Sequence, residues 1–209
     1  MLHELTIAAA AASSMKTFGD SAEMISKRII SLSKEAERVD VVFDLYQANS
    51  IKAGERIRRT KKDPVPMTIS SSLTGLPKDM DAFQSSIHNK NQLQKFFQDH
   101  VLQNQERLSR VSVFLSGMIG EEPLKVQNGH VIKVPELSCN VEEADERLFI
   151  HLNHAIKTTN VKSLLIASSD TDVFVCAIYY YHSVFKSSGL EKLWTLSGKG
   201  HTARYLPIT

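Results

Sequence analysis

Apolar residues follow two different spacings along this chain, and together they predict alternating strands and helices. Short, mostly apolar runs occupy residues 39–43, 111–115 and 163–168, which is typical of strands buried on both faces of a sheet. Elsewhere apolar residues recur every three or four positions, as in helices that pack on a sheet through one face; these segments are 18–37, 93–108 and 142–157. Residues 173–185 are interpreted as another helix, buried in the protein. The alternation predicts an α/β fold with a mainly parallel central sheet and helices on both of its faces.

The remaining segments complete this outline. Residues 126–134 predict a hairpin that turns at Asn128-Gly129, and residues 194–196 and 204–208 are two further strand candidates. The serine-rich stretch 64–92 is interpreted as a surface excursion, and residues 1–20 as an alanine-rich lead-in that is helical over 5–15.

Composition narrows the class of protein. A chain of 209 residues fits a single domain, 1–209, and 42% hydrophobic with 23% charged residues is ordinary for a globular protein. No apolar stretch approaches the roughly 20 residues of a membrane span, so we expect no membrane insertion. Cys139 and Cys176 both lie in apolar surroundings, which favours reduced, packed thiols and an intracellular protein, nuclear or cytoplasmic.

Two carboxylates follow the third apolar run directly. Asp170 and Asp172 stand one residue apart just after residues 163–168. Ligands gather at the carboxyl ends of parallel strands, and two like charges there are costly unless a hard divalent cation neutralises them. The spacing therefore suggests a metal-dependent reaction.

Further acids stand at the ends of other predicted elements. Asp44 closes the first strand, while Glu143 and Asp145 open the helix 142–157. Asp145 shares a stripe with Leu148, so we expect its side chain to lean toward the sheet. Acids at these positions also serve simply as helix caps or turn residues, and that interpretation stays open.

Together these acids fit two-metal hydrolysis of a phosphodiester. Two Mg²⁺ or Mn²⁺ ions about 4 Å apart can bind the attacking water and the leaving oxygen, and both ions prefer hard oxygen ligands. His151 and His154 form a His-x-x-His pair on a helix, but no third ligand accompanies them, so we interpret them as packed or solvated histidines.

At these residues the chain resembles the flap-endonuclease (XPG-like) branch of the PIN-like 5′-nuclease superfamily, and within it uncharacterised animal PIN-like proteins. Val42-Phe43-Asp44 is similar to the strand end of that family. The basic run Lys52-Ala53-Gly54-Glu55-Arg56-Ile57-Arg58-Arg59 matches its basic helix. Glu143-Ala144-Asp145 and Asp170-Thr171-Asp172 resemble its two later metal motifs, in the same order, over roughly residues 40 to 180.

The resemblance implies a three-layer α/β/α fold and a nuclease-like activity on DNA or RNA. It makes Asp44, Glu143, Asp145, Asp170 and Asp172 the metal ligands, and gives Lys52 and Arg59 the role of neutralising the scissile phosphate. Other basic residues would follow the nucleic-acid backbone: Arg56, Arg58, Lys61 and Lys62. Without the neighbouring acids, the same basic segment would be an ordinary solvated helix.

The chain departs from the family pattern at three points. Residues 1–20 are not expected to form the family's first, aspartate-bearing strand; the family's last aspartate has no counterpart before Thr209; and Leu45 replaces a usual glycine. We therefore expect a fold that is incomplete at both ends. The departures leave two alternatives to a nuclease: a catalytically degenerate domain that binds nucleic acid or a protein partner, and a small phosphate-ester hydrolase.

Overall fold

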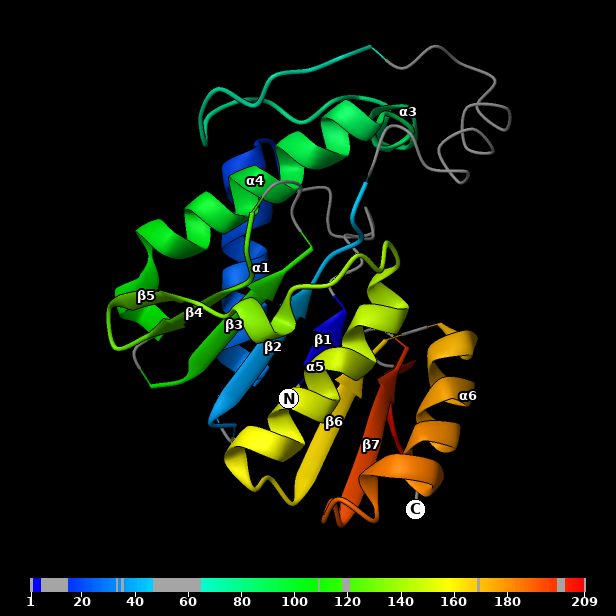
Figure 1. Ribbon diagram of the computed structural model, residues 1–209. Helices are drawn as coiled ribbons and strands as arrows, with labels where there is room; N and C mark the ends of the chain where they lie inside the picture. Colours follow the sequence, from blue (N-terminus) through cyan, green and yellow to red (C-terminus); the bar gives the residue numbers. More distant parts are fainter. Residues whose placement is uncertain are drawn as a thin grey trace.

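One eight-stranded sheet organises the molecule, with the strand order β5-β4-β3-β2-β1-β6-β7-β8 (Figure 1). The computed structural model describes residues 2–4, 15–32, 34, 36–46, 65–108, 110–117, 121–168, 170–198 and 202–208. The strands are β1 (Leu2–Glu4), β2 (Arg38–Val42), β3 (Ser112–Ser116), β4 (Leu124–Gln127), β5 (His130–Lys133), β6 (Ser163–Ala167), β7 (Lys192–Ser197) and β8 (Arg204–Pro207).

The centre of the sheet is parallel and its edges are antiparallel. Five neighbouring strands run parallel in the order β3-β2-β1-β6-β7, so the chain adds strands first on one side of β1 and then on the other. The hairpin β4–β5 and the pair β7–β8 form the antiparallel edges. The predicted α/β class and the hairpin at Asn128-Gly129 are confirmed. The three apolar runs of the sequence are confirmed as the strands β2, β3 and β6.

Helices cover both faces of the sheet (Figure 1). α1 (Phe18–Leu32) and α4 (Ile87–Gln103) share an apolar cluster with Val39 and Val41 of β2. On the opposite face, α5 (Ala144–Thr159) and α6 (Thr171–Tyr180) share a second cluster with Val42. Successive residues of a strand point to opposite faces, so the apolar run of β2 supplies both clusters.

The helix predicted over 93–108 begins earlier than its apolar spacing indicates. After residues 65–79 and the short α3 (Met80–Gln84), α4 starts at Ile87, with Ser86 as its N-cap. Asn89 is fully buried in the first turn, where its side chain bonds the backbone of Met67 and Val65. A buried polar residue of this kind interrupts the apolar pattern, which explains why the first turn was missed.

Residues 1–20, interpreted from the sequence as a lead-in, do contain a strand, although β1 bears no aspartate. The backbone of β1 lies in the middle of the sheet, where Leu2 pairs with Asp40 of β2 and with Ile166 of β6. Three residues are too few to produce a recognisable apolar run, and both neighbours hold β1 through backbone pairing. The predicted helix over residues 5–15 lies almost wholly outside the described residues.

A buried polar network connects β2 and β3 to α5. Asp40 is fully buried, and its two carboxylate oxygens accept hydrogen bonds of 2.7 Å from the Arg38 guanidinium. His151 Nδ1 of α5 lies 2.7 Å from Asp40 Oδ1, and His151 Nε2 lies 2.7 Å from Ser116 Oγ of β3. Because a carboxylate only accepts, Nδ1 donates to Asp40, which leaves Nε2 able to accept from the Ser116 hydroxyl.

This network is structural. Serine, histidine and aspartate stand in the order of a hydrolase triad, but Ser116 and His151 are only 3% and 1% exposed, so a substrate does not reach the hydroxyl. Burial by itself would raise the pKa of Asp40, yet the hydrogen bonds from Arg38 and His151 outweigh it and hold that pKa below its ordinary value. The charged carboxylate thus fixes α5 on the sheet.

The pH dependence of stability provides a test of this network. His154 Nδ1 accepts a hydrogen bond of 3.0 Å from Arg38, and partial burial together with the Arg38 charge lowers the His154 pKa below 6.5. A lowered folded-state pKa contributes stability that is present above the unfolded value and lost as the pH falls through the folded value. The free energy of unfolding should therefore decline as the pH drops below 6.5.

We expect this decline to be shallower in His154→Asn, because the asparagine Oδ1 can accept from Arg38 but does not titrate. Urea unfolding at a series of pH values measures both slopes, with His182→Asn, a substitution of an exposed histidine, as the control. Equal slopes for wild type and His154→Asn would contradict this role of His154.

Candidate functional site

The carboxyl edge of the parallel strands carries the predicted site. Asp44 follows β2 and Asp170 follows β6, and these two strands flank β1, where the direction of strand addition reverses. In doubly wound α/β folds, ligands bind in the crevice outside the strand ends at this reversal. The strand order therefore favours a binding site at the same edge of the sheet where the acidic residues lie.

Asp44 joins the end of β2 to the start of α5. Its Oδ1 atom accepts a hydrogen bond of 2.8 Å from the backbone N–H of Ala144, and Oδ2 accepts one of 2.8 Å from the Tyr46 hydroxyl. The backbone N–H of Leu45 donates to the carbonyl of Glu142 at 2.7 Å. Two consecutive residues after β2 are thus bonded to the segment that opens α5, and Asp44 caps that helix from another element.

Glu143 and Asp145 flank this contact. Glu143 is the N-cap residue of α5, but its side chain makes no capping bond, which is the role that Asp44 takes. Asp145 lies in the first turn and is half-buried. The buried Arg147 donates to the carbonyls of Val141 and Cys139, at 2.6 and 3.1 Å, which folds the preceding segment against the helix.

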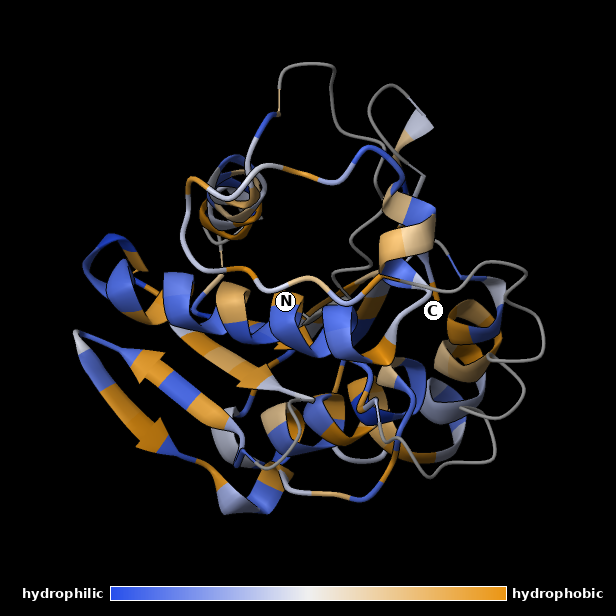
Figure 2. Cartoon of the chain, turned by 90° about the horizontal axis from the view of Figure 1, so that it is seen from above, coloured by the Kyte–Doolittle hydropathy of each residue, from blue (hydrophilic) through white to orange (hydrophobic). Residues whose placement is uncertain are grey.

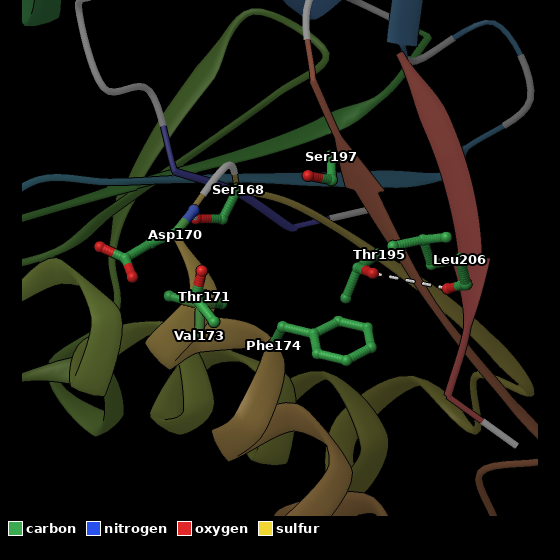
Figure 3. A pocket seen from close by; sticks show the side chains of 8 residues that line it. All are labelled: Ser168, Asp170, Thr171, Val173, Phe174, Thr195, Ser197 and Leu206. Atoms are coloured by element: carbon green, nitrogen blue, oxygen red, sulfur yellow. Dashed lines mark hydrogen bonds between the residues drawn. The ribbon is translucent and has the colours of Figure 1, made fainter. Parts of the chain in front are cut away.

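Asp170 and Asp172 open α6 and are exposed. Asp170 is the N-cap of α6: its Oδ1 accepts from the backbone N–H of Asp172 at 2.8 Å, and its own N–H donates to Ser168 Oγ at 3.1 Å. Figure 3 shows the Asp170 carboxylate turned away from Phe174 and Thr195. The Asp170 carboxylate therefore stabilises the start of α6 through this capping bond.

The first turns of α5 and α6 lie close to one another. Burial raises the pKa of the Cys176 thiol, and the negative charges of Asp172, Asp145 and Glu146 raise it further. The negative charges at the starts of both helices therefore act on the same thiol. Cys176 itself is exposed, which corrects the expectation of a packed thiol, because it stands on a side of α6 that the described part of the chain does not cover.

The structure thus brings Asp44 to the start of α5, and Asp145 and Asp172 to the neighbourhood of one thiol. Within the described ranges, however, no three His, Cys, Asp or Glu side chains lie close enough together to hold one metal ion. The predicted catalytic residues Lys52 and Arg59 lie outside the described residues, as do the predicted nucleic-acid contacts Arg56, Arg58, Lys61 and Lys62.

A cavity of about 210 Å³ opens beside Asp170 (Figure 3). Hydroxyl groups and one aromatic ring dominate its wall, and Thr195 Oγ1 lies 3.5 Å from the carbonyl oxygen of Leu206. The lining residues are Ser168, Asp170, Thr171, Val173, Phe174, Thr195, Ser197 and Leu206. Sequence reasoning missed Phe174, Thr195 and Ser197, because single polar or aromatic residues in an apolar strand or helix give no distinctive pattern.

Comparison with family models, with curated proteins and with solved structures finds no match to this chain. Among the helices that the structure describes, none is long and apolar enough to cross a membrane. The case for a function therefore rests on the residues at the sheet edge.

The capping bond of Asp44 leads to a test of the site's architecture. We expect Asp44→Ala to lower the free energy of unfolding by about 1 kcal/mol, because the Ala144 N–H loses its acceptor. Asp44→Asn should cost less, since its amide oxygen can still accept. Urea unfolding compares the two, and equal losses would show that Asp44 does not cap α5.

Proposed function

We propose that this protein binds nucleic acid at the carboxyl edge of its sheet and hydrolyses phosphodiester bonds there with divalent metal ions. The observation that carries the proposal is the bond from the Ala144 N–H to Asp44, because it joins a strand-end carboxylate to the start of the helix that bears Glu143 and Asp145. The strand order and the helices on both faces support a three-layer, PIN-like arrangement as part of the same proposal.

The donor set has the right chemistry for Mg²⁺ or Mn²⁺. All the candidate ligands are carboxylates, which suit hard cations: Asp44, Glu143, Asp145, Asp170 and Asp172. When bound, such ions would help to ionise the attacking water and offset the charge that develops on the leaving oxygen.

The chain's own contribution is orientation. Asp44 is held by Ala144 and Tyr46, and Asp170 is held by the N–H of Asp172. A carboxylate oxygen that accepts one hydrogen bond keeps a second lone pair, so these bonds aim the groups without using them up. The amino-terminal ends of α5 and α6 add positive potential at the same edge, which favours an approaching phosphate.

Positive charge and a cavity complete the proposed interface. Lys52 and Arg59 would neutralise the scissile phosphate, while Arg56, Arg58, Lys61 and Lys62 would follow the backbone of the strand. The cavity beside Asp170 would accept a sugar or base next to the cleavage point, with Phe174 as an apolar wall.

Nuclease activity is the direct test. We expect wild type to cleave flapped or single-stranded oligonucleotides with Mn²⁺, and Asp170→Asn combined with Asp172→Asn to reduce the rate about 100-fold or more. Asparagine is a good N-cap, so α6 should still form and the loss should report on chemistry. Asp81→Asn, at an exposed acid in the first turn of α3, is the matched control. Cleavage by wild type at the rate of the double variant would exclude this activity.

A second candidate is a non-catalytic domain that binds nucleic acid. The specific observation in its favour is that Asp44 and Asp170 both act as helix caps, and that the described residues contain no set of three ligands for one ion. Capping alone explains why acids stand at these two positions.

This candidate predicts binding that needs no metal. In EDTA, fluorescence anisotropy should detect an oligonucleotide complex whose affinity falls with salt, because Lys and Arg contacts release counterions. Arg58→Gln with Lys61→Gln should reduce the salt slope by about one unit for each contact removed. An affinity that requires Mn²⁺, or a salt slope that both substitutions leave unchanged, would count against it.

A further inference from the structure

α6 is apolar on nearly every side, although among the described residues only one of its sides is buried. Val173 and Ala177 are buried beneath it, whereas Val175, Ile178 and Tyr179 are 58%, 39% and 67% exposed. Figure 2, seen from above, shows this helix at the outside of the molecule in largely hydrophobic colours. A helix that is hydrophobic all round is normally buried, so the outer side of α6 has the composition of a contact surface.

A groove of about 430 Å³ runs beside this surface, between α5 and the end of α6. Stacked rings form part of it: Phe149 lies 4.8 Å from Tyr180, and Tyr180 lies 5.9 Å from Phe185, measured between ring centroids. Val184, 37% exposed, adds to its apolar lining. The groove therefore continues the apolar surface from α6 onto α5.

The charges of the groove stand at its two ends. Glu146 and Lys157 both line it, and both are exposed. They lie on one stripe of α5 with Ile150 and Asn153, about 16 Å apart along the helix axis at 1.5 Å per residue. One end of the groove is thus acidic, the other is basic, and the middle is uncharged.

We propose that the α5–α6 face binds a second copy of this chain across a two-fold axis. A two-fold rotation about an axis perpendicular to α5 reverses the helix end for end, so Glu146 of each copy meets Lys157 of the other. The same rotation brings the exposed apolar side chains of the two α6 helices, Val175 and Tyr179, into one shared contact. The surface is complementary to itself in charge, which is what an isologous dimer requires.

Sedimentation velocity over a range of protein concentrations tests this pairing. We expect a monomer–dimer equilibrium in wild type and a dissociation constant raised about tenfold or more in Tyr179→Asp, which puts a charge into the apolar contact. Glu146→Lys should also weaken the dimer, because two lysines would then face each other. Glu146→Lys combined with Lys157→Glu should restore it, since the exchanged charges pair again across the axis.

The controls distinguish loss of the dimer from loss of the folded structure. Lys78→Glu changes an exposed charge in the segment that leads to α3 and should leave the equilibrium unchanged. Alkylation of Cys176 should slow as the dimer forms, with Cys139 as the internal reference. A wild type that stays monomeric at every concentration, or a double charge exchange that fails to restore the dimer, would overturn the proposal.

Discussion

The buried carboxylate of Asp40 is the constraint on which the arrangement of this protein depends. A charge removed from water is tolerated only when donors surround it, and here Arg38 and His151 provide them. Arg38 stands on the same strand as Asp40 and reaches α5 through His154. His151 reaches from α5 to Asp40 on β2 and to Ser116 on β3 at once. Shifting α5 by one residue would take His151 away from both Asp40 and Ser116 and leave the buried imidazole without these partners.

The position of α5 in turn determines what the sheet edge can do. Once the helix is fixed, its first N–H groups lie against the residues that follow β2, and Asp44 supplies the acceptor that Glu143 does not. Capping a helix and binding a cation both use a carboxylate oxygen as an electron-pair donor, and a carboxylate has enough lone pairs to do both. The same few acids can therefore stabilise the start of a helix and also bind a metal ion.

The strands and the acidic residues at the sheet edge could be predicted from the sequence, but the buried polar contacts between strands and helices could not. Apolar runs such as residues 163–168 predict buried strands because both faces of the sheet are covered. Asp40 interrupts the apolar run of β2, and His151 precedes Leu152 of the inward stripe of α5. The hydrogen bond between them could not be predicted, because the sequence does not show which helix packs on which strand. The helix predicted at 173–185 is confirmed, although Tyr179 and its neighbours are exposed: composition shows that a helix is apolar without showing what covers it.

The three-residue strand β1 has a consequence for how the sheet assembles. It pairs Leu2 with Asp40 on one side and with Ile166 on the other, and it is the seam between the halves β3–β2 and β6–β7. Each half contains pairings between segments much closer together in the chain, whereas the seam joins residue 2 to residue 166 and carries the larger loop-closure entropy. The pairing of β1 with β6 therefore closes the longest loop among these strand pairings, and it joins the two halves into one hydrogen-bonded sheet.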